Sequence, residues 1–145
     1  MHEPRIIKPG VGVGDFELGM TRPQLWARTD STVLSFLPSG AADRTDTFLM
    51  HGVQVEYCEG AARSFMVFAR MQDHRLAPII VFDEDVSGFT RADVEALLDL
   101  QGLAREELVE QIIVESVGLT FGFREDVDQP QRVEFVLVES IEAGA

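Results

Sequence analysis

The same helix-start pattern occurs twice in this chain, first as LGMTRPQL and later as SGFTRADV. In each copy a threonine, Thr21 or Thr90, stands three residues ahead of a side chain, Gln24 or Asp93, that can bond back to the threonine amide. This reciprocal arrangement is typical of a capped helix N-terminus. We therefore expect a helix to begin at each place, and the second helix to bury an apolar stripe that includes Val94.

Each helix start is followed by three stretches in which apolar and polar residues alternate. The first set reads TFLMHG, VQVEYCEG and RSFMVFAR, and the second reads QIIVES, VGLTFGFRE and RVEFVLVES. A period of two is typical of a strand that is buried on one face, and the short joins favour antiparallel meanders. The runs RIIK and APIIVF are expected to add a strand before each helix. In residues 26–44 we expect a short helix to end near Thr29 and the rest of the segment to be irregular chain.

These elements predict an α+β fold made of two tandem units. Each unit has one helix and a three-stranded antiparallel meander, with the helices packed on one side of the sheet or sheets. The units are expected to span residues 1–75 and 76–145 and to form one compact, pseudo-symmetric domain. A chain of 145 residues, 46% of them hydrophobic, is long enough to bury a core of that size.

The segment GMTRPQL, followed by a meander and then repeated, resembles the β-lactamase-inhibitor-protein-like architecture. The small lipoprotein of the outer-membrane β-barrel assembly machine carries a single unit of similar kind. The resemblance covers most of the chain and implies a protein that binds other proteins and is not an enzyme. The chain lacks a lipoprotein cysteine near its start and a disulfide pair within a repeat, so what the resemblance implies here is a binding scaffold.

Charge is distributed unevenly between the two expected units. The net charge is -13, and residues 1–75 hold 8 Lys/Arg and 9 Asp/Glu, whereas residues 76–145 hold 4 and 16. With Lys8 as its one lysine, the chain is not expected to bind nucleic acid, because phosphate binding depends on clustered cations. The acidic half either keeps the protein soluble or attracts a basic partner.

A cytosolic, non-catalytic protein-binding module is the leading functional hypothesis. Its most specific form is an immunity-type inhibitor that masks a basic toxin or nuclease. The hypothesis is compatible with either a monomer or a homo-oligomer. No run approaches the roughly 18 apolar residues of a membrane helix, and MHEPRIIKPG lacks the features of a signal peptide. The candidate partner-binding residues lie in loops at the edges of the units: Asp83, Glu84, Asp85, Glu125, Asp126 and Asp128.

Sites for cofactors, metals or catalysis are not expected. The glycine-rich segment PGVGVGDFELG lacks the spacing of a phosphate or dinucleotide loop. The histidines His2, His51 and His74 have no nucleophile-elbow context or metal-ligand spacing, and the single cysteine, Cys58, is expected to be a half-buried thiol.

A competing hypothesis rests on the strand VGLTFGF. The residues on one face of this strand are Gly118, Thr120 and Gly122, so that face is nearly bare. Bare strand faces allow close approach, either by another layer of the fold or by a ligand. The alternative function is therefore a small-molecule-binding protein or an enzyme that uses this face, and a deep apolar pocket there would favour it.

Overall fold

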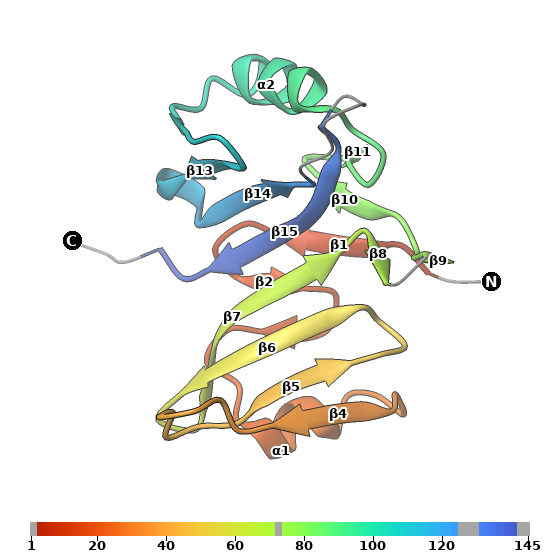
Figure 1. The fold of residues 1–145 in the computed structure, drawn as a ribbon, viewed down its shortest axis with the longest axis vertical. Coiled ribbons are helices and arrows are strands. Elements are labelled where there is room, and N and C mark those ends of the chain that lie inside the picture. Colours follow the sequence, from red (N-terminus) through yellow and green to blue (C-terminus); the bar gives the residue numbers. More distant parts are fainter. Residues whose placement is uncertain (1–2, 72–73, 125–130, 142–145) are drawn as a thin grey trace.

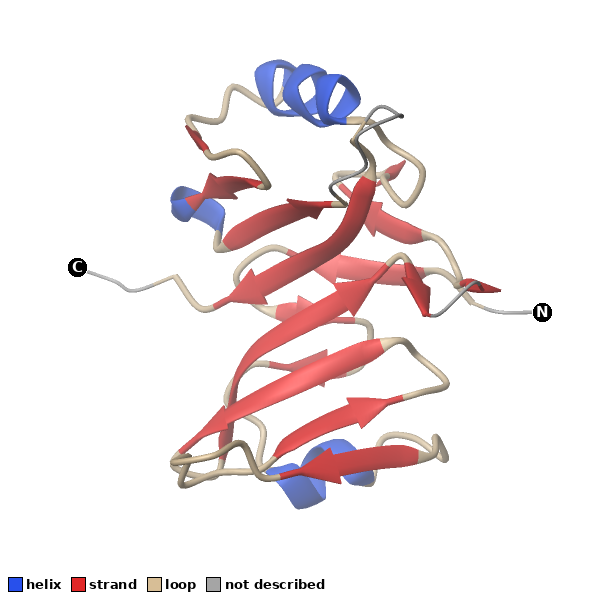
Figure 2. Ribbon diagram, viewed as in Figure 1, coloured by secondary structure: helices blue, strands red, loops and turns tan. Residues whose placement is uncertain are grey.

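The protein is mostly β. A computed structural model describes residues 3–71, 74–124 and 131–141. Strands make up 46% and helices 14%, and the strands form sheets of eight, five and two (Figure 2). The expected α+β fold of two units, each with one helix and three strands, is therefore wrong.

The eight-stranded sheet is antiparallel throughout and includes strands from both halves of the chain. Its two central strands, β7 and β15, pair with each other, and three further strands lie beyond each of them (Figure 1). The order across the sheet is β12 (Glu106–Glu107), β13 (Gln111–Val114), β14 (Leu119–Phe123), β15 (Val133–Glu139), β7 (Ala61–Phe68), β6 (Val53–Cys58), β5 (Thr45–Phe48) and β4 (Val33–Phe36).

A second sheet of five strands combines the start of the chain with its middle. The expected strands RIIK and APIIVF are confirmed as β1 and β10, and they pair in parallel. The glycine-rich segment supplies two more strands, and a Cβ atom on Gly12 would lie 2.0 Å from the Phe16 carbonyl oxygen. The order is β11 (Glu84–Asp85), β10 (Ile79–Val81), β1 (Arg5–Lys8), β2 (Gly12–Val13) and β3 (Phe16–Glu17); β8 (Arg70–Met71) and β9 (His74–Arg75) form the third sheet.

Both helices begin at the expected caps. In α1 (Arg22–Trp26) the backbone N–H of Gln24 donates to Thr21 Oγ1 at 3.4 Å. The backbone N–H of Thr21 in turn donates to the side-chain oxygen Oε1 of Gln24 at 2.9 Å. The helix α2 (Arg91–Leu100) has the same reciprocal pair of bonds between Thr90 and Asp93. A 3-10 turn, η1 (Glu115–Val117), precedes β14. None of the helices in the described part of the chain is long and apolar enough to cross a membrane.

The core lies between the two large sheets. Phe16 on β3 packs against Phe48 and Phe65 of the eight-stranded sheet, with ring centroids 5.0 and 6.2 Å apart. The five-stranded sheet lies behind the middle of the eight-stranded sheet, and α1 and α2 lie toward its two ends (Figure 1). The helices contribute buried side chains at those ends, among them Leu25 and Leu98. A second sheet therefore occupies much of the face that the sequence assigned to helices.

Candidate functional site

One face of the eight-stranded sheet is open. Its inner face, turned toward the second sheet, carries fully buried side chains such as Val55, Phe65 and Val136. On its outer face, Met66, Phe68 and Phe135 remain half-buried. In Figure 1 this outer face is turned toward the viewer, and no helix or further sheet crosses in front of it.

A continuous row of uncharged side chains crosses the outer face. Strand register places one residue from each of seven neighbouring strands directly beside the next. We call this set the outer row. From β13 to β4 it consists of Ile113, Thr120, Leu137, Met66, Gln54, Thr47 and Leu34. Four of its seven residues are apolar, so the row is a strip on which another protein surface can pack.

An open groove of about 840 Å³ adjoins the β13 end of the outer row. Ile113 and Thr120 belong both to the row and to the lining of the groove, which also includes Leu119 and Gly118. Three carboxylates line it as well, from β12, η1 and the end of β15: Glu106, Glu115 and Glu139. We call this feature the acidic groove.

The carboxylates of the acidic groove have no cationic partner among the residues that the structure describes. Arg105 also lines the groove, but it is paired with Asp99 at 2.6 Å and with Glu107 at 3.5 Å. The groove therefore offers free negative charge around an apolar floor, which suits a basic side chain carried on an apolar segment.

The expected acidic site at Asp83, Glu84 and Asp85 forms a hairpin at the edge of the five-stranded sheet. Phe82 and Asp83, with φ of 51° and 66°, make the two-residue turn between β10 and β11. Asp85 accepts hydrogen bonds from the Ser87 amide at 3.0 Å and the Ser87 hydroxyl at 2.6 Å. Burial acts to raise the pKa of Asp85, but these bonds outweigh it and the pKa lies below its usual value. Asp85 thus shapes the loop before α2, and all three residues Asp83, Glu84 and Asp85 are exposed.

The structure describes only the first half of the expected acidic site, which is the hairpin at Asp83, Glu84 and Asp85. Glu125, Asp126 and Asp128 lie outside the described residues. The hairpin and the acidic groove are on different sheets, and β11 and β13 lie on opposite sides of the upper half of the molecule in Figure 1. Each is therefore a separate candidate surface.

The expected bare strand face is largely filled by neighbouring groups. A Cβ atom on Gly122 would lie 2.2 Å from the Phe135 ring, and one on Gly118 would lie 2.1 Å from the Glu139 carbonyl oxygen. Thr120 is 6% exposed. Glycine is therefore needed at Gly122 so that the cross-strand phenylalanine can lie over the backbone. The opening beside Gly118 and Thr120 is the acidic groove and not a deep apolar pocket.

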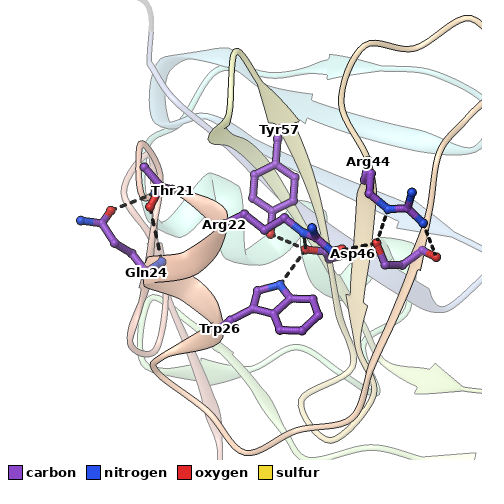
Figure 3. A network of polar contacts seen from close by, with 8 residues as sticks. Thr21, Arg22, Gln24, Trp26, Arg44, Asp46 and Tyr57 are labelled. Carbon is purple, nitrogen blue, oxygen red and sulfur yellow. Dashed lines mark hydrogen bonds and ion pairs between the residues drawn. The ribbon is translucent and has the colours of Figure 1, made fainter.

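A buried carboxylate fastens α1 to the sheet (Figure 3). Asp46 Oδ2 accepts from Arg22 Nε at 2.8 Å, from Trp26 Nε1 at 2.9 Å and from Tyr57 Oη at 2.7 Å. Arg22 also donates to the hydroxyl of Ser35 on the edge strand β4 at 3.0 Å. This cluster holds three strands and a helix together, and we assign it a structural role.

Electrostatics in the Asp46 cluster follow from burial and hydrogen bonding. Burial acts to raise the pKa of Asp46, but the bonds from Arg22, Trp26 and Tyr57 outweigh it, so the pKa lies below its usual value. Burial and the neighbouring carboxylate raise the pKa of Tyr57 well above its usual value. The Asp46 carboxylate therefore stays ionised and Tyr57 stays protonated across the physiological pH range.

A smaller cavity of about 270 Å³ lies beside Arg5 and His51. Two of its polar side chains make structural contacts: Arg5 donates to the carbonyls of His51, Phe68 and Ala77, and His51 Nε2 lies 2.6 Å from Thr29 Oγ1. Burial lowers the pKa of Arg5 to about 10 and also lowers that of His51. These groups tie β1 and the chain after α1 to the eight-stranded sheet.

Cys58 and His51 do not form a reactive pair. Cys58 is exposed rather than half-buried as expected. His51 precedes β6 and Cys58 ends it, so an extended strand separates them by roughly 20 Å. In the described ranges no three His, Cys, Asp or Glu side chains come together in a way that could hold a metal ion.

Comparisons with protein-family models, with curated proteins and with solved structures gave no match. The candidate site therefore rests on the geometry of this chain.

The carboxylates of the acidic groove were missed by sequence reasoning. Glu106, Glu115 and Glu139 come from three different elements and meet through the pairing of β12 with β13, of β13 with β14 and of β14 with β15. The one signal in the sequence was the excess of Asp and Glu in residues 76–145.

Proposed function

We propose that the protein is a non-catalytic binding module that docks a basic protein partner into the acidic groove and onto the adjoining part of the outer row. The observation that carries this proposal is the set of three unpaired carboxylates, Glu106, Glu115 and Glu139, around the apolar floor. The inhibitor-like resemblance of the sequence points in the same direction.

Apolar contact and charge have different roles in this proposal. The outer row next to the groove offers Ile113, Leu137 and Met66 for burial, and burying apolar area supplies most of the affinity of a protein complex. The carboxylates steer a basic partner and fix its orientation, because exposed charges act mainly on the association rate.

The most specific form of the proposal is a cytosolic immunity-type inhibitor of a basic toxin or nuclease. Its support is the net charge of -13, concentrated in the half that forms the groove. An inhibitor of this kind is expected to be encoded beside its toxin. Co-expression of the two reading frames should then restore growth that the toxin alone abolishes.

The experiment compares two triple variants that remove the same charge. Glu106→Gln/Glu115→Gln/Glu139→Gln neutralises the groove, and Glu17→Gln/Asp30→Asn/Glu59→Gln neutralises three exposed carboxylates in residues 1–75. Association rates with the basic partner are measured for both and for the unmodified protein across a salt series. We expect the groove triple to slow association on the order of tenfold and to flatten its salt dependence.

The matched triple separates a docking site from general acidity. If charge acts only through the net value, both triples slow association equally, and the proposal of a specific groove is wrong. A third variant, Asp83→Asn/Glu84→Gln, tests the hairpin in the same way. The competing small-molecule function has no comparable support, because Phe135 fills the space over Gly122.

A further inference from the structure

The two edges of the eight-stranded sheet differ in their protection. At one edge, β12 is two residues long and both are glutamates, Glu106 and Glu107. At the other edge, β4 spans Val33–Phe36 and contains no charged residue and no proline. Natural sheets protect their edges with short strands, charges or prolines, because an open edge pairs readily with another chain. By this criterion β12 is protected and β4 is not.

Apolar side chains gather at the β4 edge. Leu34, Phe36 and Leu37 are 57%, 48% and 53% exposed. Leu34 and Phe36 lie on the outer face, opposite Thr47 and Thr45. Side chains of this size at a strand edge are costly to leave in water, since burying a Leu or Phe yields about 1.5–3 kcal/mol.

The edge strand is held in place before any partner arrives. The Ser35 hydroxyl accepts from Arg22 Nη2 at 3.0 Å and from Arg44 Nε at 2.8 Å. Arg22 is itself fixed by the buried carboxylate of Asp46 (Figure 3). A strand that is already ordered loses little conformational entropy when it pairs.

The backbone N–H and C=O groups of every second residue of β4 point away from the sheet. The Leu49 amide donates to the Thr32 carbonyl at 3.0 Å, so by the alternation of an antiparallel ladder the backbone groups of Val33 and Ser35 face the open edge. Arg44 Nη2 donates to the Ser35 carbonyl at 3.2 Å, and Arg44 is exposed enough to move aside.

We propose that two copies of this chain associate by antiparallel pairing of β4 with β4. A strand that pairs antiparallel with its own copy makes a two-fold, self-complementary contact. The outward amides and carbonyls of Val33 and Ser35 bond across the axis. Leu34 and Phe36 of the two copies then lie side by side on one extended outer face.

The charge distribution favours a second copy as the occupant of this edge. β4 belongs to residues 1–75, with 8 Lys/Arg and 9 Asp/Glu, whereas the acidic strands β12 to β15 lie toward the other end of the sheet. Pairing at β4 therefore keeps the two acidic halves apart. A contact through one four-residue strand buries less than the roughly 1,200 Å² of a stable complex, so we expect a weak, concentration-dependent dimer.

The test is sedimentation of the full chain between about 1 µM and 1 mM, the range in which such weak pairs form. The unmodified protein should pass from monomer to dimer as its concentration rises. Leu34→Lys should raise the dissociation constant of the dimer at least tenfold, because it removes an apolar contact and places two like charges across the two-fold axis. Leu100→Lys is the matched control, since Leu100 is 80% exposed on α2 and should leave the dimer unchanged.

Two further readouts keep the inference separate from the proposed function. Added salt should strengthen the dimer, because it screens two copies of charge -13, whereas it should weaken binding of a basic partner. The Val33 and Ser35 amides should exchange more slowly with solvent as concentration rises. A monomer at about 1 mM, equal weakening by both lysine variants, or exchange at Val33 and Ser35 that does not depend on concentration would each overturn the pairing.

Discussion

At Asp46 one carboxylate oxygen accepts three hydrogen bonds in a fully buried position. A buried charge is tolerated only when donors replace the lost water, and here an arginine, an indole and a phenol do so. The same three donors lie on α1 and β6, so the cluster fixes a helix of only five residues that would not be stable alone.

Asp46→Asn should lower the free energy of unfolding by about 3 kcal/mol at pH 7, because the amide cannot replace a charged acceptor of three bonds. Asp30→Asn, at an exposed position, is the control and should change little. Urea unfolding measures both.

The pH dependence of the Asp46→Asn effect has a defined sign. The pKa of Asp46 is lowered in the folded protein, so its stabilisation is present above the unfolded value of 3.8 and is lost as the pH falls through the folded pKa. The difference between the unmodified protein and the variant should therefore shrink below about pH 4. A difference that is absent at pH 7, or that grows in acid, contradicts this role.

At the scale of elements, each helix depends on a single capping threonine. Thr90→Ala should lower the free energy of unfolding by about 1 kcal/mol, because the Asp93 amide loses its acceptor. Thr32→Ala, at an exposed position outside the helices, is the comparison and should have a smaller effect. Equal effects of the two substitutions would argue against the cap.

The contact between β14 and β15 depends on a glycine. Gly122→Ala should destabilise the protein by about 1–3 kcal/mol, because its Cβ atom would overlap the Phe135 ring. In a Phe135→Ala background the same change should be nearly neutral. Thermal unfolding of the four proteins of this cycle gives the coupling, and a Gly122→Ala cost that persists without the phenylalanine would contradict the packing.

The sequence predicted the elements whose signals are local. Thr21 and Thr90 cap helices as expected. The strands β6, β13, β14 and β15 lie within the alternating stretches, and β7 begins two residues before its stretch. The edge strands were missed for a physical reason: β4 has Leu34 and Phe36 on its open face, and β12 is a pair of glutamates, so neither shows a buried-face alternation. The parallel pair of β1 and β10 depends on residues about seventy positions apart, which no local pattern reveals.

At the scale of the whole molecule, the acidic half of the chain could be read from composition, but its arrangement could not. The unpaired carboxylates of the acidic groove converge only through the register of β12 to β15. One of the residues expected to bind, Asp85, instead holds a loop through Ser87. Composition thus predicted the sign of the surface charge, whereas the fold determines where unpaired charges lie beside apolar surface.

The most direct test of the central claim is a map of backbone amide chemical-shift changes when the basic partner binds. We expect the changes to concentrate on β13, β14, β15 and β7, with the largest at Ile113, Thr120 and Leu137 and around Glu115. Changes confined to the five-stranded sheet, or to the hairpin at Asp83 and Glu84, would contradict docking at the acidic groove and the outer row.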